Sequence, residues 1–180
     1  GHSLGEFSAL VSANIITFKD ALQIIKVRSH AMSTSNNMQP GDMAAIIGAN
    51  EIDIVTICNQ KGVVVPANIN APGQIVISGE KKAVHNAIEK AKEIGLRRTI
   101  PLNVSGAFHS PLMQSARKPL QRIINSVNFQ ETKTPIYQNI LAKPVTDTRI
   151  IQDNILNQLE QPVLWKDTIE NMIKDGITNF

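Results

Sequence analysis

The sequence predicts an α/β protein in which a parallel-sheet core carries an inserted ferredoxin-like (split βαβ) small subdomain. Three observations lead to this fold class. Helix-like and strand-like segments alternate along the chain, which is typical of a parallel sheet covered by helices. The central segment, 42–103, changes rhythm and follows the order β-α-β-β-α-β of a split βαβ lobe. The flanking segments, 1–41 and 104–180, return to the pattern of the core.

Two helices are predicted before the small subdomain, over 5–13 and 19–33. In the second, apolar residues recur at helical spacing, and Asp20 lies near its start. The polar stretch STSNNMQPGD that follows contains Pro40 and Gly41, so we expect a loop there that marks the first boundary.

The small subdomain is predicted to contain four strands and two helices. The strand candidates are MAAIIG, VVVPANIN, QIVISG and RRTIPLNV. The helix candidates are EIDIVTICNQ and the strongly amphipathic EKKAVHNAIEKAKEIG, which ends at Gly95. Pro72 and Gly73 supply the turn between the second and third strands.

The second part of the core again mixes helices and strands. SPLMQSARKPLQRIINSV is predicted to be a helix kinked at Pro119, and TPIYQNI to be a buried strand. Residues 148–174 supply two helices divided at Pro162, and ITNF begins another strand.

Composition excludes several classes of protein. The 180 residues are 42% hydrophobic and 18% charged, which fits a globular protein that buries a core. Aromatic residues make up only 4%, and the net charge of +3 is scattered, so we expect no nucleic-acid partner. No apolar run approaches the length of a membrane-spanning helix, so no membrane association is expected. Cys58 is the only cysteine, which points to a cytoplasmic location, and no cluster of metal-ligand residues is apparent.

The first five residues, GHSLG, match the G-x-S-x-G nucleophile elbow. In such an elbow the serine occupies a tight, strained turn before a helix, and small residues on either side allow close approach of the backbone. The turn exposes Oγ at a helix N-terminus, where free N–H groups can stabilise an oxyanion. Taken alone, the pattern more often marks a helix start at which Ser3 only acts as a cap.

A serine nucleophile needs a base, and the chain contains four histidines. His2 adjoins Ser3 on a sharp turn and is expected to pack against or support the site. His30 lies on a predicted helix, and His85 lies on the polar face of another, so we expect both at the surface. His109 lies between a strand end and a new helix, where α/β folds present functional groups, and is the best candidate.

Five segments together resemble the malonyl-CoA:acyl carrier protein transacylases. They are GHSLGEFSALVSA, KVRSHAM, NINAPGQIVISG, VSGAFHSPLM and NQLEQPVLW, and they stand in the family's order at similar separations from residue 1 to 180. The combination of GHSLGE with AFHS is what distinguishes the chain from a generic serine hydrolase.

The resemblance implies roles for three reactive side chains. Ser3 would attack the malonyl thioester, and His109 would accept its proton and later activate the incoming thiol. Arg28 matches the arginine that binds the malonyl carboxylate, a task suited to the planar, forked guanidinium. Without the resemblance, Arg28 would be interpreted as a surface residue of a helix.

The same resemblance implies supporting roles for five further residues. The backbone carbonyl of Gln158 would hold His109 in place of a triad carboxylate, and the backbone N–H of Leu4 would contribute to the oxyanion hole. Asn139 would be a supporting polar residue, and Phe108 would favour malonyl over bulkier methylmalonyl groups. His2 would lie at the substrate-binding side of the site.

The implied activity is malonyl transfer in fatty acid biosynthesis by a stand-alone enzyme. Malonyl-CoA and acyl carrier protein would be its partners; no cofactor would be bound, the phosphopantetheine being carried by the partner, and we expect a monomer. The family has a further segment before the elbow that supplies a second oxyanion-hole N–H, whose loss costs about 3 kcal/mol in the transition state. We therefore expect the 180 residues to be part of a longer enzyme and not fully active alone.

Two other functions remain open at this point. A serine esterase or thioesterase of the α/β-hydrolase type would need an Asp or Glu between Ser3 and His109 to orient the base. The acidic residues in that interval fall mainly on polar helix faces or in loops, and an inserted split βαβ lobe does not suit that fold. A non-catalytic module that binds acyl carrier protein is the other alternative.

Overall fold

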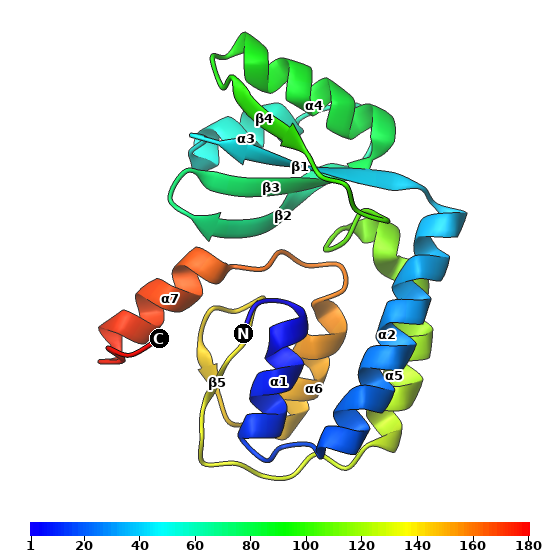
Figure 1. Ribbon diagram of the computed structural model, residues 1–180, viewed down its shortest axis with the longest axis vertical. Helices are drawn as coiled ribbons and strands as arrows, with labels where there is room; N and C mark the ends of the chain where they lie inside the picture. The colour runs from blue at the N-terminus through cyan, green and yellow to red at the C-terminus, as the bar shows by residue number, and fades with distance from the viewer.

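The computed structural model describes residues 1–180, which form a helical part and a sheet-containing lobe (Figure 1). The helical part is built from discontinuous segments of the chain. Its elements are α1 (Leu4–Ser12), α2 (Phe18–Met38), the 3-10 helix η1 (Pro111–Ala116), α5 (Arg117–Ser126), α6 (Thr148–Asn157) and α7 (Trp165–Lys174).

The lobe contains a four-stranded sheet with two helices on one face. Its elements are β1 (Gly41–Ile47), α3 (Glu51–Cys58), β2 (Val64–Ala71), β3 (Gln74–Glu80), α4 (Lys81–Glu93) and β4 (Arg98–Pro101). The strand order is β2-β3-β1-β4, and all three neighbouring pairs are antiparallel. Ile46 and Ile77 of the sheet pack with Ala87 of α4 in one buried cluster. Helices and strands follow each other along this segment in the predicted order.

The prediction of a parallel core sheet is wrong. Outside the lobe the only strands are β5 (Ile136–Tyr137) and β6 (Pro144–Val145), which pair antiparallel. A parallel sheet needs several extended segments side by side, and these two short strands do not provide them. Residues 177–180, predicted to begin a strand, form no regular structure and are exposed. The α/β class is nevertheless observed, because helices and strands share one chain.

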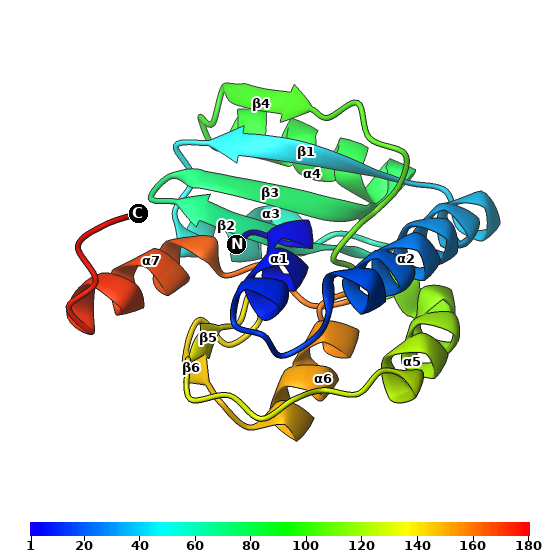
Figure 2. The same cartoon turned by 60° about the horizontal axis from the view of Figure 1, so that its bottom comes forward.

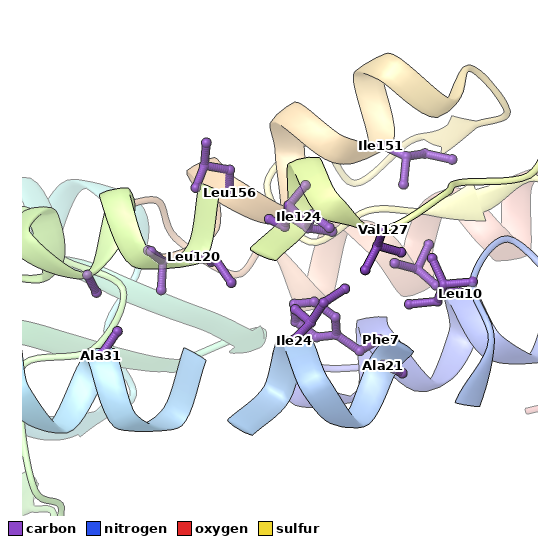
Figure 3. Packing of buried hydrophobic residues seen from close by; sticks show 14 of the residues in the cluster. Phe7, Leu10, Ala21, Ile24, Ala31, Leu120, Ile124, Val127, Ile151 and Leu156 are labelled. Atoms are coloured by element: carbon purple, nitrogen blue, oxygen red, sulfur yellow. The ribbon is translucent and has the colours of Figure 1, made fainter. Parts of the chain in front are cut away.

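The helical part is held together by its own hydrophobic core (Figure 3). Phe7 of α1, Ile24 of α2 and Ile124 of α5 meet there and are 0%, 0% and 2% exposed. Ile151 of α6 closes the cluster. Helix packs on helix here, so no sheet is needed to bury these side chains.

Two local predictions need correction in the helical part. The predicted loop after residue 33 is mostly helical, since α2 continues to Met38. Pro119 does not kink a helix; it lies in the first turn of α5, where a missing N–H costs no hydrogen bond. The change of geometry occurs earlier, between η1 and Arg117.

The lobe and the helical part are connected by backbone hydrogen bonds as well as by the covalent continuity of the chain. The segment before α7 runs alongside β2, as both views show (Figures 1 and 2). Ile69 N–H donates to Val163 O at 2.9 Å, and Val163 N–H donates to Ala67 O at 2.9 Å. Val163 is fully buried in this parallel contact, so the junction is fixed. No helix has the length and apolar character needed to cross a membrane.

Candidate active site

Ser3 lies on a strained turn directly before α1. Its backbone has φ 48° and ψ −101°, a region that residues other than glycine rarely occupy. A Cβ atom at Gly1 would lie 2.7 Å from Gly5 Cα and overlap the Gly5 carbonyl, so only glycine fits at that position. A Cβ atom at Gly5 would meet nothing within 4 Å, so within these residues the steric argument holds for Gly1 alone.

The elbow brings Ser3 into hydrogen-bond contact with His109. Ser3 Oγ lies 2.9 Å from His109 Nε2, although the two residues are far apart in the sequence. His109 Nδ1 lies 2.8 Å from the backbone carbonyl of Gln158, at the end of α6. Because a carbonyl can only accept, Nδ1 carries the proton and Nε2 is free to accept one from Ser3. The backbone of His109 also has a positive φ, 56°, so His109 is a second strained residue at the site.

Burial keeps His109 neutral. The side chain is 4% exposed, and desolvation lowers its pKa to about 4, helped by the positive charge of Arg28 and opposed by the bond from Nδ1 to Gln158 O. At neutral pH the imidazole is therefore in the form that can act as a base.

Arg28 projects from α2 onto the same serine. Its Nη2 donates to Ser3 Oγ at 3.1 Å and to Gln158 Oε1 at 3.0 Å. The guanidinium lies 5.7 Å from the centre of the Phe7 ring, a cation–π contact that helps to orient it. Burial lowers the Arg28 pKa to about 10, so the group stays charged at neutral pH. Its buried Nε has no hydrogen-bond partner.

Asn139 and Leu4 complete the turn around the nucleophile. Asn139 Oδ1 accepts from the Ser3 backbone N–H at 2.6 Å, and its Nδ2 donates to Gly1 O at 3.0 Å, which fixes the strained turn from both sides. Leu4 is the first residue of α1, so its N–H has no acceptor within the helix. That N–H is therefore available to an oxyanion formed next to Ser3.

A cavity of about 450 Å³ opens onto these groups, between the helical part and the lobe. Ser3, Arg28 and His109 line it on one side, and Met43 and Asn68 line it from the lobe. Phe108 also lines the cavity and packs against the hydrophobic clusters of both parts. The site thus lies between the helical part and the lobe, and the apolar ring of Phe108 lies at their interface.

The remaining histidines do not reach the serine. His2 is half-buried at the cavity; its Nε2 lies 3.0 Å from Asn70 Oδ1, and its ring lies 5.6 Å from that of Trp165. It links the elbow to β2 and α7, and its supporting role stays a prediction. His30 and His85 are exposed, as predicted.

One group at the site was not predicted from the sequence. Glu6 is 1% exposed and accepts hydrogen bonds from the side chains of Gln138 and Gln158 and from the backbone of Asn139. The spacing Ser3-x-x-Glu6 would indicate a capping box, but Ser3 makes no side-chain cap bond. A glutamate on the buried side of a helix was the available signal, because such a group needs partners.

Neither a metal site nor a reactive thiol is found. No group of three or more His, Cys, Asp or Glu side chains is arranged to hold a metal ion. Burial raises the pKa of the Cys58 thiol to about 11, so it is protonated at neutral pH and is not a nucleophile. The acceptor on His109 is a backbone carbonyl rather than the carboxylate of a hydrolase triad.

Comparison with known families matches the acyl transferase domain over residues 1–180. The chain belongs to this family. The malonyl CoA-acyl carrier protein transacylase of Staphylococcus aureus (strain MSSA476) is 38% identical over 184 residues, covering 100% of this chain and 60% of that protein. The protein of the same name from Bacillus subtilis (strain 168) is 40% identical and is covered to 58% of its length. The predicted resemblance is confirmed, and the chain spans about 60% of the length of the first of these acyl transferases.

Solved structures agree with this assignment. Malonyl-CoA:acyl carrier protein transacylase from Xanthomonas oryzae pv. oryzae superposes with a TM-score of 0.94 at 34% identity, covering 99% of this chain and 58% of that one. A malonyl-transacylase solved in complex with a type II PKS acyl-carrier protein has a TM-score of 0.92 at 36% identity, covering 98% and 58%. The acyl transferase fold of these proteins is therefore the fold of this chain.

Proposed function

We propose that the protein transfers a malonyl group from coenzyme A to the phosphopantetheine thiol of acyl carrier protein, in fatty acid biosynthesis. The observation that carries the proposal is the placement of a buried, charged Arg28 on the oxygen of a serine that is also bonded to a neutral histidine. The relatives bearing the transacylase name support the choice of donor and acceptor.

In the first half-reaction Ser3 Oγ attacks the thioester carbonyl of malonyl-CoA. His109 Nε2, at 2.9 Å, accepts the hydroxyl proton, and the Gln158 carbonyl stabilises the imidazolium through Nδ1–H. Collapse of the tetrahedral intermediate breaks the C–S bond. The coenzyme A thiolate takes the proton from Nε2, which leaves a malonyl ester on Ser3.

Leu4 and Arg28 stabilise different charges in this step. The free N–H of Leu4 binds the oxyanion that forms at the carbonyl carbon. Arg28 binds the malonyl carboxylate, for which its partnerless Nε is a spare donor. An acetyl group would leave that buried donor unsatisfied, so the same contact selects for malonyl.

In the second half-reaction the phosphopantetheine thiol of the carrier accepts the malonyl group. His109 Nε2 takes the thiol proton, and the thiolate attacks the carbonyl carbon of the seryl ester. The tetrahedral intermediate collapses with cleavage of the C–O bond to Ser3, and the imidazolium returns the proton to Ser3 Oγ, which leaves the malonyl thioester on the carrier. The solved complex of a related malonyl-transacylase with its acyl-carrier protein supports this partner.

The organisation of the chain is also part of the proposal. We assign residues 42–103 to a ferredoxin-like small subdomain inserted between 1–41 and 104–180. The strand order β2-β3-β1-β4 and the separate hydrophobic cluster of the lobe support these bounds. A cytoplasmic monomer that needs no bound cofactor stays a prediction from the sequence.

Intact mass measurement tests the function directly. The full-length protein is incubated with malonyl-CoA and separately with acetyl-CoA, and Ser3→Ala serves as the matched control. We expect a stable malonyl adduct in the serine form only, discharged when holo acyl carrier protein is added. Release of free malonate without a carrier would instead indicate a hydrolase, and carrier binding without any adduct would indicate a binding module.

A further inference from the structure

The buried carboxylate of Glu6 has no part in the steps described above. It lies in the first turn of α1, just after the nucleophile, and is 1% exposed. Its Oε1 accepts from Gln138 Nε2 at 3.0 Å. Its Oε2 accepts from Asn139 N at 2.9 Å and from Gln158 Nε2 at 3.0 Å. All three partners are donors, so the site is arranged for a group that only accepts, as the ionised carboxylate does. Burial raises the pKa of Glu6, and the three hydrogen bonds counteract that shift.

The Gln158 carboxamide connects this carboxylate to Arg28. Its Nε2 donates to Glu6 Oε2 at 3.0 Å, and its Oε1 accepts from Arg28 Nη2 at 3.0 Å. The amide is therefore held between a buried anion and a buried cation, with each end facing its complementary charge. The backbone carbonyl of the same residue accepts from His109 Nδ1 at 2.8 Å.

We propose that Glu6 is a positioning residue, whose buried carboxylate fixes the Gln158 carboxamide and thereby orients both Arg28 and His109. Its charge fixes which end of the amide faces Arg28, because a reversed amide would turn its NH₂ group toward the guanidinium and its oxygen toward the carboxylate. The backbone of Asn139, held by the same oxygen, ties the arrangement to the residue that supports Ser3.

The isosteric variant Glu6→Gln shows why charge rather than shape is needed. A glutamine offers one acceptor oxygen and one NH₂ group to three surrounding donors. At least one donor would then face another donor inside the protein, which is unfavourable. Where that donor is Gln158 Nε2, the amide keeps only its longer contacts to Ser3 O at 3.2 Å and Asn139 Oδ1 at 3.3 Å, and Arg28 is held less firmly.

The first test is kinetic and rests on the proposed function. In the full-length protein, kcat/KM for Ser3 acylation by malonyl-CoA is divided by that for acetyl-CoA. We expect Glu6→Gln to lower this ratio about tenfold, because orientation of Arg28 matters only for the carboxylate-bearing substrate. Gln158→Ala, which keeps the backbone carbonyl, should do the same, and the double variant should lose no more than either single one. The exposed Glu131→Gln is the matched control and should leave the ratio unchanged.

The second test is spectroscopic and does not depend on the substrate. The ¹⁵N shifts of the His109 ring report its tautomer, which we expect to be Nδ1–H in the native protein and mixed in Glu6→Gln and Gln158→Ala. A changed tautomer in a protein that does not accept malonyl would overturn the proposed function and leave the positioning role intact. If Gln158→Ala keeps both the native ratio and the native tautomer, or if the two substitutions are additive, Glu6 does not act through Gln158. The Gln158→Ala measurements decide the question even if Glu6→Gln does not fold.

Discussion

Arg28 Nη2 and Ser3 Oγ lie 3.1 Å apart, so the nucleophile's oxygen is shared between a guanidinium and the imidazole of His109. The guanidinium donates, so the Ser3 hydroxyl proton is left to point at Nε2. The cation therefore orders the Ser3 hydroxyl, and under the proposed function an entering malonyl carboxylate would meet the same cation. Under that proposal, Arg28 would contact both the Ser3 hydroxyl and the charged end of the substrate.

Replacing Arg28 by Ala should remove selection for the charged acyl group. We expect kcat/KM for malonyl-CoA to fall by a factor on the order of 100, since a hydrogen-bonded charge pair is lost, and acetyl-CoA to be affected far less. Acylation of Ser3 followed by mass spectrometry gives both values. Arg122→Ala, an exposed arginine on α5, is the control, and equal losses for the two substrates would contradict the role of Arg28.

The rate of Ser3 acylation should fall in acid only at pH values well below the ordinary pKa of histidine. Ser3 reacts when His109 is neutral, and burial lowers the His109 pKa from 6.5 to about 4. The second-order rate constant for a neutral serine-directed probe should therefore rise through pH 4 and be flat from pH 5 to 8. A neutral probe avoids titration of the substrate, and circular dichroism at each pH checks folding. A midpoint near pH 6.5 would contradict the lowering of the His109 pKa by burial.

The buried His109 side chain should also make the folded protein less stable in acid. Between about pH 6.5 and 4 the unfolded chain binds a proton at His109 and the folded chain does not, so the free energy of unfolding decreases as pH falls. Urea unfolding at pH 7.5 and at pH 5 should show a smaller decrease for His109→Gln than for the native protein. An identical decrease in both would mean that the proton uptake occurs elsewhere.

Gly1→Ala should damage the elbow itself. The new Cβ would lie 2.7 Å from Gly5 Cα, so we expect a loss of about 2 kcal/mol in unfolding free energy together with a loss of Ser3 reactivity in the folded protein. Gly79→Ala is the matched control, because its Cβ would lie 2.7 Å from Val64 Cα in the lobe. It should lower stability while Ser3 in the folded fraction keeps its reactivity. A destabilised Gly1→Ala variant that keeps Ser3 reactivity would show that Gly1 is needed for stability and not for the geometry of the elbow.

Phe108→Ser should widen the acyl-binding cavity. The ring lines the cavity and packs against both clusters, so its removal leaves space beside the acyl group. We expect the ratio of methylmalonyl to malonyl acylation to rise several-fold. Met113→Leu, a buried substitution outside the cavity lining, controls for a general loss of packing. An unchanged ratio would show that selection against the methyl group comes from another residue.

Short-range signals in the sequence predicted the local structure of the site well. GHSLG predicted the strained turn at Ser3, because tight turns and helix starts depend on a few neighbouring residues. The position of His109 between a strand and a helix made it the candidate partner of Ser3, and its Nε2 lies 2.9 Å from Ser3 Oγ. The lobe's helices and strands followed from hydrophobic periodicity in the same way.

Long-range pairing was harder to predict. Whether strands are parallel depends on which segments lie side by side, and periodicity carries no such information, so the core sheet was predicted wrongly. Glu6 was missed for a similar reason: its partners Gln138 and Gln158 come from distant segments, and nothing around Glu6 indicates them.

The loop that contains Val163 has a mechanical consequence. At one end, the Gln158 carbonyl holds His109; farther along, Val163 is paired with β2 of the lobe, and Leu164 N–H donates to Asn139 O at 2.8 Å. The segment 158–163 thus connects the carbonyl that holds His109 to β2 of the lobe. Because Asn68 of β2 lines the cavity, a displacement of β2 would be transmitted through this segment to the carbonyl that orients the His109 ring.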